Sequence, residues 1–483
     1  MQMRERVRTF FSEGSAPRSI FFASLALHLL FFSLLVFNYG PYSFFLSSDG
    51  SLSNNDTQHY VVIAKNLAEG NGYSRFPDAP FEPDALRTPL LPLYFVTFLY
   101  LGGLSLVWLA ILLLQFLLAL TPVVLYKIAR QFLSHEYSLI AALALAAEPI
   151  FLYRSQIAEP DALLVFFLII ATYCIVSFWE RYGNVHASDR YWYAACAVLG
   201  ISILAKPTAQ YVTVLFFIAH TAFLFFFHRK IGRADAKNLI FGALLILLIL
   251  SPWLFRNHRV FGVWGMSSIA TYNLYDYYTG NIKMSGETIP EYIQIGSREP
   301  SRYLPYESFF MSTAVARIKA RPIEYGKEQA IGSLRNLFVS DLPAIYYYGH
   351  TKILPFSYNP ESKTNLHELL ARGDFAALSK ALIFETSLKL LWVAALCAMY
   401  VLCFVALFSA WRKDRLSFFV FLFFGLLFAY FVIVSGPYVD AKYRLPALPL
   451  LFTVALYGIE VLIKGAASKS GTQIRRSVSM NEQ

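Results

Sequence analysis

Long apolar stretches alternate with short polar segments along most of this 483-residue chain. A membrane span needs about 20 mostly apolar residues to cross the hydrocarbon core. On this measure the sequence predicts about ten spans, near residues 19–38, 107–129, 137–154, 161–180, 191–205, 208–227, 237–254, 387–411, 417–435 and 446–463. The apolar run from Leu90 to Leu101 is too short to cross and follows Pro89, so we expect an interfacial helix there. The pattern predicts an all-α polytopic membrane protein.

The N-terminal apolar run, from Ile20 to about Phe37, is longer than the roughly 7–15 apolar residues of a signal peptide. We therefore expect it to remain as a signal anchor. Positive residues gather in alternate connections and should mark the cytoplasmic side. They are Arg4, Arg6, Arg8, Lys127, Arg130, Arg181, Arg190, residues 228–233 and 411–415, Lys464, Lys469, Arg475 and Arg476. This distribution predicts both termini inside and an even number of spans.

The same topology divides the chain into four parts. Residues 1–254 form an N-terminal transmembrane module whose first outer loop, 39–106, holds the candidate chemistry. Residues 255–386 form an extracytoplasmic lobe, in which Arg321-Pro322 starts an amphipathic helix with an apolar stripe. Residues 387–465 form the C-terminal transmembrane helices. Residues 466–483 are polar, and we expect a disordered cytoplasmic tail.

Composition narrows the class of protein. Only 15% of the residues are charged and 57% are hydrophobic, whereas soluble domains average about 25% charged residues. The net charge of +10 fits cytoplasmic loops and anionic headgroups, so we expect membrane lipids and no nucleic acid as partners. All four cysteines lie in apolar runs, which predicts buried thiols and neither a disulfide nor a thiolate metal site.

One polar stretch, residues 54–93, follows the first span. Asp56 opens a short amphipathic helix in which Tyr60, Ile63, Ala64 and Leu67 recur at helical spacing. A helix-capping role for Asp56 is a simple interpretation of this position. Gly70 and Gly72 end the helix, and an Arg-Thr-Pro turn at residues 87–89 starts the next one.

Further polar residues lie at the predicted outer ends of the spans, at the same membrane level as Asp56. They are Glu148, Arg154, Glu159, Asp161, Lys206, Arg256, Asn257, Asp440, Lys442, Tyr443 and Arg444. An ionisable group near the centre of a span costs about 2.5–3.5 kcal/mol on insertion scales. Single residues of this kind often only snorkel to the interface. A cluster of both signs on one side instead indicates a polar cavity.

These motifs resemble the GT-C glycosyltransferase superfamily, whose members use lipid-phosphate-linked sugars, and most of all its protein mannosyltransferase-like and lipopolysaccharide-sugar transferase branch. Asp56, Tyr60, Gly70–Tyr73 and Arg87–Pro92 resemble the first outer loop of that branch. The resemblance extends to three other segments, at Glu148–Asp161, at Arg256-Asn257 and at Lys442–Pro446. It implies a GT-C-like bundle with interfacial helices in the first outer loop and a large outer lobe.

Sugar transfer from a polyprenyl phosphate sets definite chemical demands. The phosphate leaving group needs positive charge at its oxygens and no general acid. Arginine can supply a bidentate contact and lysine a point charge. The acceptor hydroxyl must lose a proton, so one carboxylate is needed as general base. One prominent aspartate among several cations fits transfer better than hydrolysis, which uses two carboxylates.

The resemblance implies roles for particular residues. Asp56 is the expected base, assisted by Asp161 or Glu159. Arg444 is the expected main phosphate ligand, with Lys206, Arg256, Lys442 and Tyr443 as further candidates. The order Lys442-Tyr443-Arg444 departs from the Arg-Tyr-x-x-Pro pattern of the family, so Lys442 and Arg444 both qualify as the key cation.

Three residues of the first outer loop have candidate supporting roles. His59 and Tyr60 lie one turn after Asp56; His59 could contact Asp56 or the acceptor, although such a histidine is more often only interfacial. Arg87 could bind phosphate, or it could close the loop by pairing with Glu82 or Asp84, which is the favoured interpretation. Some superfamily members use a divalent cation such as Mg²⁺ or Mn²⁺, with Asp56 and Asp161 as the candidate ligands in this chain. The sequence leaves that open.

The expected function is an inverting glycosyltransferase of the bacterial inner membrane, with its active site on the extracytoplasmic face. Its partners would be a polyprenyl-phosphate-linked sugar donor and a glycolipid, glycan or protein acceptor, with glycolipid and cell-envelope glycan ranked first and lipopolysaccharide among them. A lipid-glycan flippase or transporter is an alternative, but it would show inverted repeats and charges near the bilayer midplane. An envelope-glycan polymerase or ligase with a diphosphate-linked donor would centre on Arg and His without the Asp56 helix.

Overall fold

The computed structural model describes residues 12–41, 56–182, 185–228, 231–280, 282, 304–339 and 375–480. These residues form helices and connecting segments, with no β-strand among them. The elements are α2 (Ala16–Tyr39), α3 (Asp56–Ala68), α4 (Leu90–Gly102), η1 (Gly103–Leu106), α5 (Val107–Leu118), α6 (Thr121–Ala129), α7 (His135–Ala146), α8 (Pro149–Ser155), α9 (Asp161–Glu180), α10 (Val185–Ala205), α11 (Ala209–His228), α12 (Arg233–Phe261), α13 (Ile269–Tyr272), η2 (Asn273–Tyr278), α15 (Glu307–Ala320), α16 (Pro322–Phe338), α19 (Phe375–Lys413), α20 (Arg415–Val434), η4 (Ala441–Tyr443) and α21 (Leu448–Met480).

The predicted all-α polytopic membrane protein is confirmed. Within the described residues, eight helices are long and apolar enough to span a membrane, or nine if the bent pair of α7 and α8 counts as one span. The α7–α8 pair covers the predicted span at 137–154 and bends by 48°. The one remaining predicted span, 191–205, lies within α10. Its apolar run is only about 22 Å long at the helical rise, which is short for a span.

The segment between Leu90 and Ala129 differs from its prediction in one respect. A helix forms over the expected range as α4, and η1, α5 and α6 follow it directly. Together they make one apolar segment of 40 residues. Only Gly102, Gly103 and Ser105 interrupt the apolar residues between the run at 90–101 and the next, so hydropathy alone does not separate the two, and the interfacial position of α4 stays a prediction.

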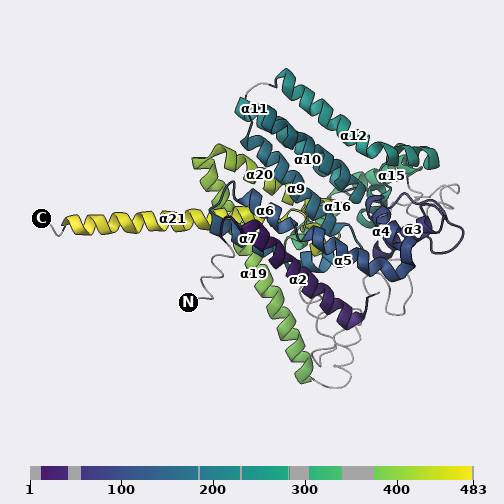
Figure 1. Ribbon diagram of the computed structural model, residues 1–483, viewed down its shortest axis with the longest axis horizontal. Coiled ribbons are helices and arrows are strands. Elements are labelled where there is room, and N and C mark those ends of the chain that lie inside the picture. Colours follow the sequence, from purple (N-terminus) through teal and green to yellow (C-terminus); the bar gives the residue numbers. More distant parts are fainter. Residues whose placement is uncertain are drawn as a thin grey trace.

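The buried centre of the bundle is α9. In its most apolar window 83% of the residues are buried, against 17% for the peripheral α19. Helix α10 packs between α9 and α12, as Figure 1 shows. Helix α19 packs against α21. Because α9 begins at Asp161, an acidic residue lies where the most buried helix meets the segment before it.

The cysteines only partly match expectation. Cys174, Cys196 and Cys403 are buried free thiols, as predicted, whereas Cys397 is exposed on α19. The apolar run around Cys397 predicted burial because sequence hydropathy does not distinguish a protein-facing side of a helix from a lipid-facing side.

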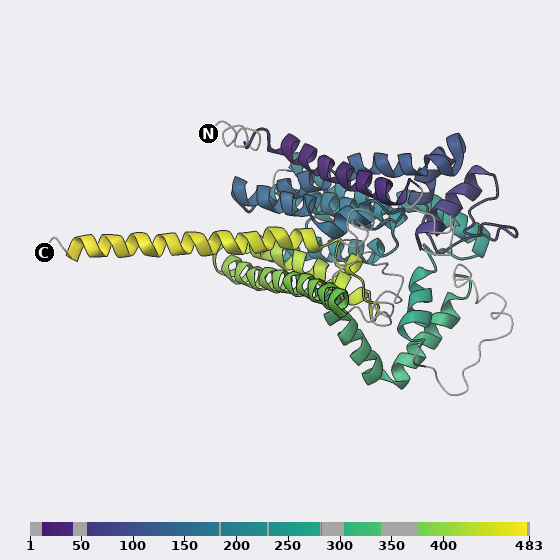
Figure 2. The same ribbon diagram turned by 90° about the horizontal axis from the view of Figure 1, so that it is seen from below.

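The lobe contains the predicted amphipathic helix, α16, but not the predicted packing face. Ile323 and Leu334 of its apolar stripe are 86% and 59% exposed. Gly332 and Asn336 are buried against the segment after α20. Leu337 and Phe338, at the C-terminal end of the helix, pack against the main core. Figure 2 shows α15 and α16, drawn in dark green, standing beside the longer helices.

Helix α21 continues beyond its membrane-spanning part. Its backbone is helical to Met480, and it projects past the other helices at one end (Figures 1 and 2). The disordered cytoplasmic tail expected over residues 466–483 stays a prediction. A polar composition excludes burial in a core, but it does not prevent a helix from propagating out of the preceding span.

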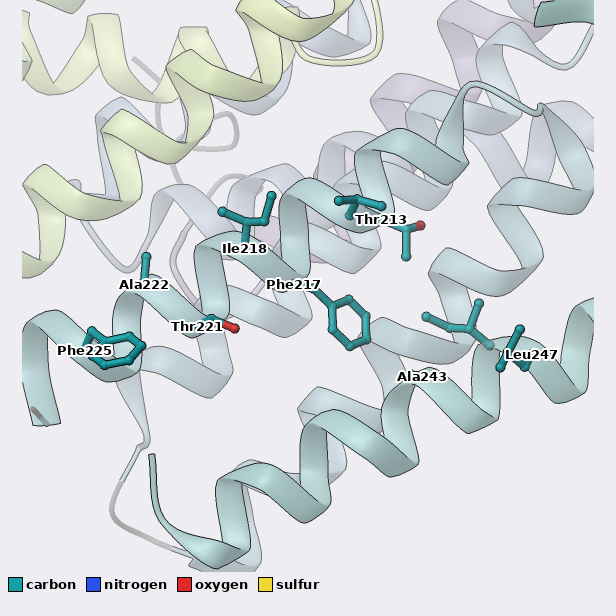
Figure 3. A pocket seen from close by; sticks show the side chains of 10 residues that line it. Thr213, Phe217, Ile218, Thr221, Ala222, Phe225, Ala243 and Leu247 are labelled. Carbon is teal, nitrogen blue, oxygen red and sulfur yellow. The ribbon is translucent and has the colours of Figure 1, made fainter. Parts of the chain in front are cut away.

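An apolar groove of about 700 Å³ opens between α11 and α12. Figure 3 shows Phe217 of α11 pointing toward Leu247 of α12. Thr213, Ile218 and Phe225 also line the groove. Apolar walls are expected where membrane-spanning helices face hydrocarbon. The polar candidate residues lie elsewhere.

The docking of α16 can be tested with one pair of variants. A Cβ atom at Gly332 would lie 2.3 Å from the carbonyl oxygen of Gly436, whereas one at Gly326 of the same helix meets nothing within 4 Å. Gly326→Ala should stabilise the helix by up to about 1 kcal/mol. Gly332→Ala should destabilise the protein by about 1–3 kcal/mol, because the backbone must move.

The measurement is the apparent Tm of both variants in the same detergent. Equal gains in Tm for Gly332→Ala and Gly326→Ala would contradict the close packing of α16.

Candidate active site

The loop before α4 is held rigidly by a buried carboxylate. Asp84 accepts hydrogen bonds from the backbone N–H of Leu86 at 3.0 Å and of Arg87 at 2.9 Å. Its other oxygen lies 3.0 Å from Nε of Arg75. The Thr88 hydroxyl donates to the carbonyl of Ala205 at 2.9 Å. These contacts fix the position from which the Arg87 side chain extends.

Arg87 joins this loop to the start of α3. Its guanidinium forms an ion pair with Asp56 and hydrogen bonds with Nδ1 of His59, at 3.2 Å from Nε and 3.0 Å from Nη2. It also lies over the ring of Tyr60, 5.4 Å from its centroid. The expected pairing of the Arg87 side chain with Glu82 or Asp84 is therefore wrong, because the Arg87 side chain pairs with Asp56. Asp84 accepts a hydrogen bond from the backbone N–H of Arg87, and its ion pair is with Arg75.

The charges of Asp56 and His59 follow from this arrangement. Burial raises the pKa of Asp56, but the positive charges of Arg87 and Lys442 outweigh that effect and hold it below its usual range. Burial, Arg87 and Arg75 lower the pKa of His59 to about 3. At neutral pH the site therefore presents an aspartate anion beside a neutral imidazole. The Asp56 side chain is 57% exposed and can be reached by a reactant.

The second acidic position contributes two carboxylates with different partners. Glu159 accepts a hydrogen bond from the Thr57 hydroxyl at 2.8 Å, so it holds the first turn of α3 next to Asp56. Asp161 is buried and pairs with Lys206, whose Nζ lies 2.6 Å from Oδ1. Glu159 thus lies closer to the Asp56 helix, while Asp161 ties α9 to the turn before α11.

Lys442 is the cation whose charge is supported by three acidic side chains. It lies in η4, where Asp440 accepts a hydrogen bond from its backbone N–H at 2.8 Å. Burial lowers the pKa of Lys442, but Asp161, Glu159 and Asp440 together raise it above its ordinary value. The side chain is 14% exposed. Its ammonium group is therefore charged, shielded from bulk water and close to the acidic side chains. The Tyr443 ring lies beside it, with its centroid 5.8 Å from Nζ.

Arg444 and Arg256 do not occupy the positions expected of phosphate ligands. Arg444 is fully buried and donates hydrogen bonds to the carbonyls of Asn336 and Val339 at the end of α16. Arg256 donates to the carbonyl of Asp84 at 2.7 Å and to Oδ1 of Asn257 at 2.8 Å. Both guanidinium groups bind the protein's own backbone. These backbone contacts do not favour Arg444 as the main phosphate ligand, and that role stays a prediction.

The acidic residues offer a poor set of metal ligands. Among the described residues, no group of three or more His, Cys, Asp or Glu side chains is arranged to hold a metal ion. Asp56 faces Arg87, and Asp161 faces Lys206. Two carboxylates that each face a separate cation do not fit one shared divalent ion such as Mg²⁺ or Mn²⁺.

Sequence reasoning assigned no site role to four of the residues that organise this region: Thr57, Arg75, Arg154 and Asp440. Arg154 and Asp440 were recognised as charged residues at the outer ends of spans. Their pairing at 3.0 Å could not be predicted, because 286 positions separate them. Thr57 directly follows Asp56, but nothing in the sequence indicates that its hydroxyl binds Glu159.

Comparison with known proteins gives one match to a protein family. Residues 87–255 match the family described as dolichyl-phosphate-mannose-protein mannosyltransferase. The matched segment begins at Arg87 and includes Glu159, Asp161 and Lys206. A search of curated proteins found no match.

Two solved structures are similar to this chain over most of its length. The oligosaccharyltransferase AglB from Archaeoglobus fulgidus, in complex with an inhibitory peptide and a dolichol-phosphate, is 14% identical with a TM-score of 0.45, and the match covers 94% of this chain and 52% of AglB. ArnT from Cupriavidus metallidurans, bound to undecaprenyl phosphate, is 14% identical with a TM-score of 0.40, covering 91% of this chain and 78% of ArnT. This chain thus spans about half the length of the oligosaccharyltransferase. The family match over residues 87–255 agrees with the sequence motifs that resemble the GT-C glycosyltransferase superfamily.

Proposed function

We propose that the protein is an inverting glycosyltransferase that moves a sugar from a polyprenyl-phosphate donor to a cell-envelope glycan or glycolipid. The reaction takes place on the extracytoplasmic face of a bacterial inner membrane, with both chain termini in the cytoplasm. The observation that carries this proposal is the ion pair of an accessible carboxylate, Asp56, with Arg87. A second cation, Lys442, also lowers the pKa of Asp56. The description of the matched family names dolichyl-phosphate-mannose, which is a polyprenyl-phosphate-linked sugar donor.

Lys442 and Arg87 hold the phosphate of the donor. A phosphate that leaves as an anion is stabilised by positive charge fixed in a partly dry site. Lys442 has its charge maintained by three carboxylates and keeps a small exposed fraction. Lys206 is already paired with Asp161, and it supports the site from the α10–α11 turn. This assignment replaces Arg444 by Lys442 as the main phosphate ligand.

Asp56 accepts the proton of the acceptor hydroxyl. With Arg87 at its carboxylate, Asp56 is a weak base, because its pKa is held low. A bound phosphate competes for the same guanidinium, since arginine binds phosphate and carboxylate in the same bidentate manner. Donor binding therefore draws Arg87 from Asp56 and raises the pKa of the base when the acceptor is in place.

The transfer is a single displacement. The acceptor oxygen attacks the anomeric carbon from the face opposite the phosphate, and its proton passes to Asp56. The bond between the anomeric carbon and the phosphate oxygen breaks, and its electron pair stays on the phosphate beside Lys442 and Arg87. One attack from the opposite face inverts the anomeric centre, as in glycosidases that form no covalent intermediate.

The remaining residues orient the reacting groups. Glu159 fixes the start of α3 through Thr57. His59 is neutral and accepts a hydrogen bond from Arg87, while the Tyr60 ring supports the guanidinium. The acceptor hydroxyl of a protein side chain is the alternative to a glycan hydroxyl, and both can be supplied to one assay.

Asp56→Asn tests the base directly. The amide keeps the size of the side chain but cannot accept the proton, so transfer should fall by about 10²–10⁴-fold. The measurement is sugar transfer in proteoliposomes with a panel of polyprenyl-phosphate sugars. Lys65→Gln, on the same helix, removes a half-exposed charge paired with Glu69 and should leave transfer unchanged.

Normal turnover by Asp56→Asn would rule out Asp56 as the base. A wild-type protein that uses no donor in the panel would count against the glycosyltransferase proposal itself.

Lys442→Gln and Arg444→Gln should fail in different ways. Loss of the Lys442 charge removes phosphate binding, so the donor KM should rise by about 10-fold or more while the fold is kept. Loss of Arg444 leaves buried carbonyls of α16 without donors, which costs about 1–3 kcal/mol. We therefore expect a lower apparent Tm for Arg444→Gln and a donor-binding defect only for Lys442→Gln. A raised donor KM at unchanged Tm for Arg444→Gln would restore Arg444 as a phosphate ligand.

The pH dependence of kcat/KM reports the pKa of Asp56 in the free enzyme. The base is active when deprotonated, so activity is lost as pH falls through a pKa that lies below the ordinary value of 3.8. Arg87→Gln removes the largest lowering influence and leaves the raising effect of burial. The acidic limb should therefore move to higher pH, and Arg87→Lys should move it less.

The measurement is residual transfer by each variant across the acidic range, with activity at neutral pH retested after each exposure to exclude unfolding. An acidic limb that stays at the wild-type pH in Arg87→Gln would show that Arg87 does not control the base.

A further inference from the structure

Arg154 lies between two carboxylates from distant parts of the chain. It extends from the last turn of α8, and its side chain is 12% exposed. Nη2 lies 3.0 and 3.1 Å from the two oxygens of Asp440, and Nη1 lies 3.4 Å from Glu159. An arginine that contacts both oxygens of one carboxylate fixes the geometry of the pair as well as its charge.

Each of these two carboxylates, Glu159 and Asp440, also contacts the segment that carries a proposed catalytic or phosphate-binding residue. Glu159 accepts the hydrogen bond from Thr57, the neighbour of Asp56. Asp440 accepts a hydrogen bond from the backbone N–H of Lys442, the proposed phosphate ligand. Arg154 therefore fixes the distance between the segment that carries the base and the segment that carries the cation.

The network also reaches the outer lobe. The backbone N–H of Asp440 donates to Oδ1 of Asn336 in α16 at 3.0 Å. The Asn336 amide donates to the Ser435 hydroxyl at 2.7 Å and to the Tyr438 carbonyl at 2.8 Å. Asn336 is fully buried, and buried amides of this kind hold their position because every lost hydrogen bond is costly.

We propose that Arg154 and Asn336 are positioning residues that couple the docking of α16 to the alignment of Asp56 with Lys442. The chain of contacts runs from Thr57 through Glu159, Arg154 and Asp440 to Asn336. The inference rests on the proposed function, because it assigns Asp56 and Lys442 to the reaction. In this proposal the docking of the lobe affects the rate of the chemical step, in addition to any contact that the lobe makes with an acceptor.

The polar character of this chain of contacts supports positioning rather than stability alone. Buried ion pairs add little net stability over apolar side chains of similar size, yet they fix one relative geometry. Most of the apolar stripe of α16 is exposed, at Ile323 and Leu334, and only the C-terminal end of the helix, at Leu337 and Phe338, packs against the apolar core. Polar contacts also hold the helix, and two of those lead directly to Asp440 and its flanking loop.

The test compares Arg154→Gln, Arg154→Lys and Asn336→Leu in proteoliposomes. Misplacement of reacting groups by about 1 Å can cost 10²-fold in rate, so kcat should fall by about 10–100-fold in Arg154→Gln and Asn336→Leu, while the donor KM changes less than about 3-fold. Arg154→Lys keeps the charge and should recover part of kcat. The double variant Arg154→Gln/Asn336→Leu should be no slower than the slower single variant.

Gln329→Leu is the matched control. Gln329 also lies on α16 and donates to the carbonyl of Ile433 at 2.6 Å, outside the Arg154 chain of contacts. Its loss should leave kcat within about 3-fold of wild type. Equal losses of kcat in Gln329→Leu and Asn336→Leu would overturn the proposal, since lobe docking in general would then explain both. A loss of kcat in the double variant equal to the product of the two single losses would overturn the proposal as well.

Thermal unfolding separates this inference from the proposed function. A wild type that turns over no donor contradicts the proposed function but leaves the coupling measurable without substrate. The decreases in apparent Tm from Arg154→Gln and Asn336→Leu should then be less than additive in the double variant. Additive decreases would show that the two residues are independent, and the proposed coupling would be rejected.

Discussion

The contact between Arg87 and Asp56 is the interaction on which the rest of the site depends. Asp56 begins α3, and Arg87 ends a loop held by Asp84 and Arg75. Their ion pair brings these two segments together, keeps Asp56 ionised and keeps His59 neutral. The same guanidinium can bind a phosphate, so one side chain links the state of the base to the arrival of the donor.

Charged groups next to a membrane are tolerated when each has a partner. This constraint accounts for the architecture around the outer ends of α8, α9 and α20. Asp161 with Lys206 joins α9 to the α10–α11 turn, and Arg154 with Asp440 joins α8 to the segment after α20. The pairs needed to stabilise charge also fix the helix ends relative to one another, so membrane insertion and site geometry have the same physical origin.

Hydropathy predicted the helical membrane fold well, because lipid requires helices whose backbone groups are satisfied internally. It also predicted that Asp56, Asp161 and Lys442 lie at one level. It could not choose between Lys442 and Arg444, two residues apart, since a turn of η4 directs one side chain toward the acidic residues and buries the other beneath α16. It missed the Arg154–Asp440 pair and the polar docking of Asn336, because contacts between distant segments leave no local pattern.

The central claim is a single displacement assisted by one carboxylate, and the stereochemistry of the product tests it most directly. Transfer from a polyprenyl-phosphate sugar of known anomeric configuration can be followed by NMR of the product in proteoliposomes. The account predicts complete inversion at the anomeric carbon. Retention would contradict it, because a carboxylate such as Asp56 would then act as a nucleophile in a double displacement rather than as a base in a single one.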